Sequence, residues 1–185
     1  MKFNKVTMAV LFAASTVSTA SLAAISGNTG ELQFSGQVVN SPCNIESDSL
    51  KQEVAFGQLS RSSLEAGNAA EKNLTIKLKD CNFEQFTKGA DDKWIAVKDM
   101  KITFGGKNYV GTNKEFLGVN GTASNVGIQI KDFKFDEAKS IMNQIRNQQG
   151  ENVLEFTALA KRVNSVDKVV EGDFTSVADF KITYE

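Results

Sequence analysis

The chain has 185 residues, with 21 basic and 22 acidic side chains and no histidine. This near-neutral balance supplies no basic patch of the kind that nucleic-acid binding requires. The absence of histidine removes the usual general base and any histidine-based triad or metal site. Composition therefore argues against a nucleic-acid-binding protein and against an enzyme, and it indicates no metal and no cofactor.

Residues 1–23 have the pattern of a secretory signal peptide. Lys2 and Lys5 supply positive charge, residues 6–17 form a mostly apolar run, and Ser21-Leu22-Ala23 offers small residues for cleavage before Ala24. The run is too short and too interrupted by Ser and Thr to span a bilayer of about 30 Å. We expect export and removal of these residues, which leaves one domain; a buried N-terminal helix is the alternative.

The chain has two cysteines, Cys43 and Cys81. In an oxidising compartment we expect them to form a disulfide bond. That bond would close a loop of about 37 residues and, in the chain-entropy model, stabilise the fold by about 4 kcal/mol. Two buried free thiols are the alternative.

Residues 31–39 alternate polar and apolar side chains, the period of a strand with one apolar face. The small, glycine-containing stretch 24–30 precedes them. Gly36 lies within this strand, where glycine usually marks the close approach of another backbone or side chain. The strand is either the first of its own domain or a segment that reaches beyond it. The residues of its apolar face are Leu32, Phe34, Gly36 and Val38.

The rest of the chain shows short runs of β-branched and aromatic residues separated by Gly, Asn and Asp, which predicts an all-β sandwich or barrel. Gly105-Gly106-Lys107-Asn108 and Asn120-Gly121 have the composition of tight turns. Residues 136–148 suit a short surface helix as well as a loop. Trp94 is expected to be a partly buried strand residue; an exposed aromatic that contacts a sugar is the alternative. The predicted strands are 31–39, 52–57, 73–80, 94–98, 101–104, 126–130, 152–163 and 176–184.

The last predicted strand also alternates, and one face carries Ala178, Phe180, Ile182 and Tyr184. Only Glu185 follows, so we expect this strand to lack a downstream neighbour in its sheet. An open strand edge above an uncovered apolar face favours the addition of a strand from another molecule.

These features together resemble the chaperone–usher fimbrial subunits, type 1-like major pilins in particular. The resemblance spans essentially the whole chain after residue 23. Gly172 is fourteenth from the end and Tyr184 is penultimate, as in the terminal signature of the family. The resemblance rests on LQFSGQVVN at 32–40, on Pro42-Cys43, on Lys79-Asp80-Cys81 and on GDFTSVADFKITYE at 172–185.

The resemblance implies an incomplete immunoglobulin-like β-sandwich that lacks its last strand and is completed by a donor strand from another subunit. Residues 24–39 would be the donor extension and 40–185 the pilin domain. Leu32, Phe34, Gly36 and Val38 would be the donated face. Cys43 and Cys81 would be the intradomain disulfide. The border of the acceptor groove, which also binds the chaperone, would be Ala178, Phe180, Ile182 and Tyr184.

The implied function is that of a structural subunit of a surface fimbria, which polymerises by donor-strand exchange and supports bacterial adhesion. The implied partners are neighbouring subunits, a periplasmic chaperone and an outer-membrane usher, with an unidentified host receptor for the fibre. A minor adaptor or terminating subunit and a receptor-binding adhesin are the alternatives. The implied route is export through the periplasm to an extracellular fimbrium.

Overall fold

The computed structural model describes residues 30–185, so the predicted signal peptide lies outside the described residues. The chain divides into two units, residues 1–38 and residues 39–185. The described residues of the first unit, 30–38, form no helix or strand, and their side chains are exposed. Among residues 30–185, no helix has the length and apolar character needed to cross a membrane.

The second unit is built almost entirely of strands. Its two α-helices are short, and the second is capped by Ser60, whose hydroxyl accepts a hydrogen bond from the amide of Ser63. The helical elements are α1 (Ser47–Leu50), α2 (Arg61–Glu65) and the 3₁₀ turn η1 (Met142–Gln144). The strands are β1 (Asn44–Ile45), β2 (Ala70–Asn82), β3 (Thr87–Lys88), β4 (Trp94–Ile95), β5 (Met100–Gly106), β6 (Tyr109–Val110), β7 (Phe116–Gly118), β8 (Asn120–Gly121), β9 (Val126–Ile130), β10 (Lys139–Ser140), β11 (Gln149–Arg162), β12 (Phe174–Thr175) and β13 (Ala178–Tyr184).

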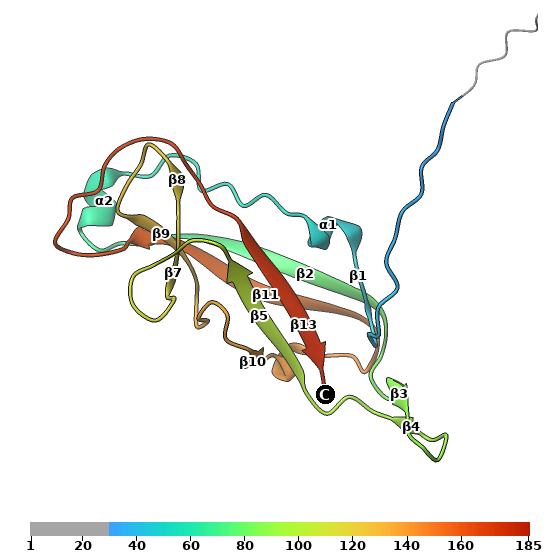
Figure 1. Cartoon of the computed structure of the whole chain (residues 1–185). Helices are drawn as coiled ribbons and strands as arrows, with labels where there is room; N and C mark the ends of the chain where they lie inside the picture. Colours follow the sequence, from blue (N-terminus) through green and yellow to red (C-terminus); the bar gives the residue numbers. More distant parts are fainter. Residues whose placement is uncertain (1–29) are drawn as a thin grey trace, which may run out of the picture. The chain divides into compact units, whose positions relative to one another are not determined.

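Two sheets form the body of this unit (Figure 1). The larger has six strands in the order β1-β2-β11-β9-β7-β6, and the long antiparallel pair β2 and β11 is its centre. The smaller has three strands in the order β10-β5-β13. Two small pairs, β8 with β12 and β3 with β4, complete the set of described strands.

The two sheets share one hydrophobic core. Leu154 and Phe156 of β11 and Ile102 and Phe104 of β5 are all buried in the same cluster. The rings of Phe104 and Phe156 meet edge to face at 5.1 Å between centroids, and Phe133 joins both. Burying each such side chain contributes about 1.5–3 kcal/mol. The fold is therefore a two-layer β-sandwich, one of the two all-β architectures that the short β-branched and aromatic runs predict.

The predicted disulfide is confirmed. Cys43 and Cys81 are bonded to each other, and both are buried. The amide of Asn82 donates a hydrogen bond of 2.8 Å to the carbonyl of Pro42 beside the bond. The disulfide thus anchors residues 42–43 to the end of β2.

Six predicted strands match strands of the structure, with ends that shift by up to a few residues. Residues 126–130 match β9 at both ends, and β2 and β11 extend beyond the predicted 73–80 and 152–163. Trp94 lies in a strand as expected, but its side chain is exposed rather than partly buried.

Two turn predictions are wrong. Residues 105–108 do not join paired strands, because β5 belongs to the three-stranded sheet whereas the following β6 pairs with β7. Asn120-Gly121 is strand β8, which pairs with β12. A Cβ at Gly121, where φ is +134°, would collide with the carbonyl oxygen of Asp173. This glycine therefore serves a close backbone approach rather than a turn.

Residues 136–148 are mostly irregular, with β10 and the 3₁₀ turn η1. Of the two alternatives for this segment, the loop is the better description. Ile141 is buried, and its amide bonds to the carbonyl of Met100, so the segment is held by the core rather than by helical hydrogen bonds. Two other predicted strands, 31–39 and 52–57, form no ladder in the structure.

A polar cluster ties two loops to the sandwich. The hydroxyl of Tyr109 donates to Asp136 at 2.7 Å, and the amine of Lys114 donates to the same carboxylate at 2.6 Å. The hydrogen bond from Lys114, followed by that from Tyr109, lowers the pKa of Asp136 below its ordinary value of 3.8. Tyr109 also accepts a hydrogen bond from the amide of Gly106 at the end of β5.

Removing the disulfide should destabilise the protein strongly. We expect the double variant Cys43→Ser with Cys81→Ser to lose about 2–4 kcal/mol in the free energy of unfolding, because the unfolded chain gains the freedom of an open loop. Urea denaturation followed by far-ultraviolet circular dichroism measures this loss. Wild-type protein treated with reductant should show the same shift. An unchanged unfolding midpoint would contradict the structural role of the bond.

Asp136→Asn should destabilise the protein in a pH-dependent way. A carboxyl group whose folded-state pKa is depressed stabilises the fold above its unfolded-state pKa, and this contribution disappears as the pH falls through the folded-state value. The variant should therefore be less stable than the wild type at pH 7; the difference should shrink as the pH falls below 3.8 and vanish once the pH is below the depressed folded-state pKa of Asp136. Thermal unfolding across this range tests the prediction, and an equal difference at both ends would refute it.

Candidate functional site

The clearest incomplete feature of the body is the free edge of β13. This strand pairs with β5 along its whole length, from Ala178 opposite Gly106 to Tyr184 opposite Met100. No strand within residues 30–185 pairs with its other edge. In Figure 1, β13 lies at the border of the three-stranded sheet and runs towards the C-terminus. The edge therefore carries backbone groups without a ladder partner from the described chain.

The side chains of β13 cover the core only in part. Phe180, Ile182 and Tyr184 are half-buried and pack against the main cluster, as their alternation predicts, whereas Ala178 is exposed. The ring of Tyr184 lies 5.9 Å from that of Phe86. Burial raises the pKa of the Tyr184 phenol, which a hydrogen bond with Ser41 partly offsets. The last residues of β13 thus lie beside Ser41, which follows the N-terminal segment.

Glu185 sets the register of β13 on β5. Its amide donates to the carbonyl of Asp99 at 2.9 Å, and its own carbonyl accepts from the amides of Lys98 and Asp99. The amine of Lys101 donates to the Glu185 carboxylate at 2.7 Å, and this hydrogen bond raises the pKa of Lys101. These contacts hold the end of β13 in place although its other edge is open.

A second segment without a ladder runs over the same core. Residues 52–57 alternate, and Val54, Phe56 and, after them, Leu59 are half-buried against the main cluster. Within the described part of the chain, the backbone of residues 52–59 makes no hydrogen bond. The ring of Phe56 lies 6.4 Å from that of Phe174, shortly before β13. The predicted strand 52–57 therefore has strand-like side-chain alternation but no partner strand.

The predicted donor face belongs to the first unit. Leu32, Phe34 and Val38 are 82%, 88% and 101% exposed. A Cβ at Gly36 would meet no atom within 4 Å, so the close approach expected at this glycine does not occur among the described residues. Residues 30–38 are absent from every strand pair that the structure describes. Three apolar side chains at strand spacing are therefore left in solvent, which is costly.

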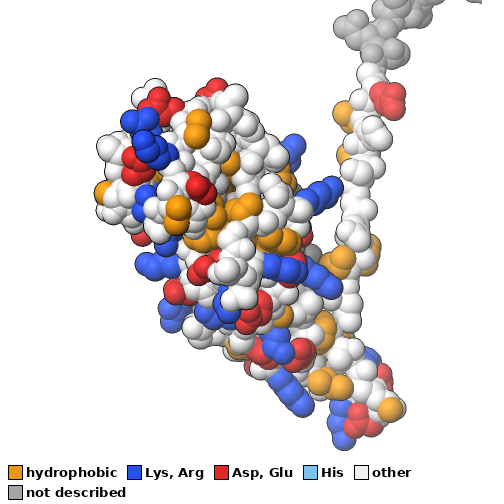
Figure 2. Space-filling model, turned by 60° about the vertical axis from the view of Figure 1, so that its left-hand side comes forward, with side chains coloured by type: hydrophobic (Ala, Val, Ile, Leu, Met, Phe, Trp, Pro, Cys, Tyr) orange, Lys and Arg blue, Asp and Glu red, His pale blue; other side chains and the backbone are white. Residues whose placement is uncertain are grey.

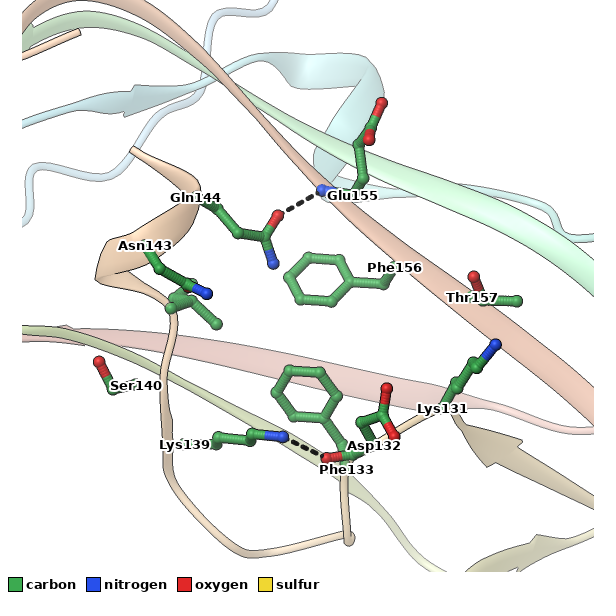
Figure 3. Close-up of a pocket in the computed structure, with 11 residues that line it drawn as sticks. Lys131, Asp132, Phe133, Lys139, Ser140, Asn143, Gln144, Glu155, Phe156 and Thr157 are labelled. Atoms are coloured by element: carbon green, nitrogen blue, oxygen red, sulfur yellow. Dashed lines mark hydrogen bonds between the residues drawn. The ribbon is translucent and has the colours of Figure 1, made fainter. Parts of the chain in front are cut away.

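The structure also contains a polar cavity of about 260 Å³ beside β11 (Figure 3). Its polar groups are largely engaged with the surrounding loop: the amine of Lys139 donates to the carbonyl of Asp132 at 2.7 Å, and Gln144 accepts from the amide of Glu155 at 2.8 Å. Phe133 and Phe156 also line the cavity (Figure 3). These bonds hold the loop that lines the cavity over the core. The cavity lies apart from the predicted donor face and from the predicted groove residues of β13.

No cluster of metal-binding side chains occurs in the part of the chain that the structure describes. The two cysteines are joined to each other and are not available as nucleophiles or ligands. The open edge of β13, rather than a set of reactive side chains, is therefore the candidate functional site.

Comparison with known proteins defines the class. Residues 32–185 match the family model described as "Fimbrial protein". The chain is 38% identical to KS71A fimbrillin of Escherichia coli over 88% of each chain, and 34% identical to the Fimbria A protein of Serratia marcescens over the full length of both. It is 36% identical to the Pap fimbrial major pilin protein of Escherichia coli over 84% of each chain.

Solved structures agree with this result. A subunit of a chaperone–usher pilus, from a study of rod uncoiling, superposes with a TM-score of 0.67 at 33% identity, over 87% of this chain and 98% of the subunit. The P pilus rod subunit PapA superposes with a TM-score of 0.62 at 34% identity, over 78% of this chain and all of the subunit. The fold is thus the immunoglobulin-like sandwich of these subunits. The chain belongs to the fimbrial protein family, a family of structural pilins.

The sequence predicts the alternating segments 31–39 and 176–184, but it does not predict that residues 52–59 lie over the core without a partner strand. Their alternation was visible, and it predicted an ordinary strand. What the sequence does not reveal is that this strand has no partner along its backbone. The chain has a single proline and no recognisable partner pattern, so neither feature signals that residues 52–59 lack a partner strand.

Proposed function

We propose that this protein is the repeating rod subunit of a chaperone–usher surface fimbria, joined to its neighbours by donor-strand exchange. The observation that carries the proposal is the free edge of β13 in a chain whose residues 30–38 expose an alternating apolar face. One copy has an unpaired segment with the alternation of a strand, and the next has a sheet edge without a partner strand. Donation between copies completes both.

Leu32, Phe34 and Val38 would occupy the neighbour's edge beside Phe180, Ile182 and Tyr184. Moving each apolar side chain out of water contributes about 1.5–3 kcal/mol, and each new main-chain hydrogen bond adds about 0.5–1.5 kcal/mol. Ordering the donor segment offsets part of this gain. Several such terms along one strand support a stable non-covalent joint, as in other cases of β-strand addition.

The direction of donation follows from where the segment joins the body. Ser41 contacts Tyr184, so residues 30–38 begin from the Tyr184 end of β13. Folding back onto its own β13 would make this segment a parallel neighbour, a slightly less stable pairing. Entry into another copy from the Ala178 end makes it antiparallel and links the copies head to tail. Such a heterologous contact generates an open filament.

The relatives favour the rod subunit over a minor adaptor, terminator or adhesin. The Pap relative is named a major pilin, PapA a rod subunit, and both match most of the chain at 34–36% identity. By analogy with the family, a periplasmic chaperone would cover the β13 edge first, and an outer-membrane usher would guide the exchange. Residues 1–23 would be the export signal, residues 24–39 the donor extension, and no catalysis would be involved. The fibre would support adhesion collectively.

Gly36→Leu should reduce fibre formation at least tenfold without changing the thermal stability of the isolated body. A Cβ at this position meets no atom among residues 30–185, but the added side chain would collide with a neighbour's strand or core. Deletion of residues 24–39 should abolish fibres entirely. Negative-stain microscopy and the yield of surface fibres measure both effects.

Ser35→Leu is the matched control, because Ser35 belongs to the opposite face of the same alternating segment. It should leave fibre yield close to the wild-type level. Normal fibres from the deletion variant, or equal losses from the substitutions at positions 35 and 36, would overturn donor-strand exchange. Cells that lose only fibre tips when the gene is removed would indicate a minor subunit instead.

A further inference from the structure

The β3–β4 hairpin, residues 86–95, carries an apolar surface that the donor-strand joint does not use. Trp94 is 51% exposed and Ile95 is 43% exposed. In Figure 2 the hairpin forms the projection at the lower right, with hydrophobic side chains on its surface. An exposed aromatic and an aliphatic side chain next to each other on a projecting element are typical of a contact surface.

The charged residues of the hairpin are paired with each other. Lys88 bonds to Asp92 at 2.7 Å, and Lys93 bonds to Asp91 at 3.0 Å. The amine of Lys88 also lies 5.4 Å from the centroid of the Trp94 ring. The four charges cancel, so the tip has no net charge that would attract an ionic ligand. What it offers a partner is the apolar surface of Trp94 and Ile95.

The hairpin lies at the end of the body from which the donor segment departs. The amide of Phe86 donates to the carbonyl of Ile95 at 3.1 Å, and the ring of Phe86 packs on Tyr184. Tyr184 in turn contacts Ser41. The residues that follow the donor segment and the base of the hairpin therefore share one neighbour, Tyr184.

The opposite end of the body exposes valines. Val177 is 80% exposed and directly precedes β13, whereas Val166 and Val170 are 90% and 51% exposed in the preceding loop. Seven strand residues separate the two ends of β13, a length of about 20 Å. A head-to-tail fibre would bring this valine-bearing end of one copy to the hairpin end of the next.

We propose that the β3–β4 hairpin docks on the Val177 end of the subunit that accepts this chain's donor segment. This inference rests on the proposed function. In the antiparallel joint, Val38 would lie near the acceptor's Ala178, and the five steps from Val38 to Cys43 span at most about 17 Å. The acceptor's Val177 end is thereby kept close to the hairpin.

The contact is too small to hold two free subunits together, since stable interfaces bury about 1,200 Å² or more. Tethering changes this, because the donor strand gives the hairpin an effective concentration in the millimolar range at its target. The hairpin would then act as a second attachment point that restricts bending at each joint of the fibre.

Photo-crosslinking tests the inference. Full-length copies that carry p-benzoylphenylalanine in place of Trp94 are assembled, and complexes of two copies are isolated and irradiated. We expect a covalent dimer that survives boiling in detergent, with the cross-link mapped to residues 166–177 of the other copy. The control places the same photoreactive residue at Val153, a comparably exposed position on β11. It should yield at least tenfold less covalent dimer.

The possible failures are distinguishable. If two-copy complexes form but the Trp94 position gives no more covalent dimer than the Val153 position, the docking inference is wrong and donor-strand exchange stands. A cross-link mapped outside residues 166–177 likewise refutes the docking site. If full-length copies form no complexes at all, the proposed function fails, and this inference fails with it.

Discussion

The unpaired edge of β13 is the constraint on which the rest of the structure depends. A strand that places aromatic and aliphatic side chains over a core, with backbone groups open along one edge, is an unfavourable end to a sheet in water. Within residues 30–185, β5 supplies the only ladder for this strand. The half-buried state of Phe180, Ile182 and Tyr184 shows that the sandwich leaves part of this face uncovered.

Contacts elsewhere in the protein hold β13 in place, so that its free edge stays accessible to another strand. Glu185 fixes the strand against Asp99 and Lys101, so β13 stays in register with β5 without a second neighbour. The disulfide anchors residues 42–43 to the end of β2, which sets the place where the N-terminal segment leaves the body. The alternating apolar face of residues 30–38 has no partner strand among the residues that the structure describes. Under the proposed function, a second copy completes the sandwich.

The sequence predicts strands that can be recognised from their own residues. It does not predict the pairing of segments that are distant along the chain. Alternation identified β13, and runs of β-branched and aromatic residues identified the centre of β2 and β11, and β9 at both ends. Strands buried on one or both faces carry these patterns in their own residues. Asn120-Gly121 was misread, since its glycine serves the approach of β12, which lies some fifty residues away along the chain. Residues 52–57 alternate like a strand, but the partner that would complete their ladder is not in the described chain. Two-residue strands such as β6 are too short to show a period.

Hydrogen–deuterium exchange of the isolated subunit and of assembled fibres measures the central claim most directly. The account predicts that the amides of residues 32–38 and 52–59 and the free edge of β13 exchange rapidly in the isolated subunit, and that all three become strongly protected in the fibre. The amides of β2 and β11 should be protected in both states. Equal exchange of residues 32–38 and of the β13 edge before and after assembly would contradict the account.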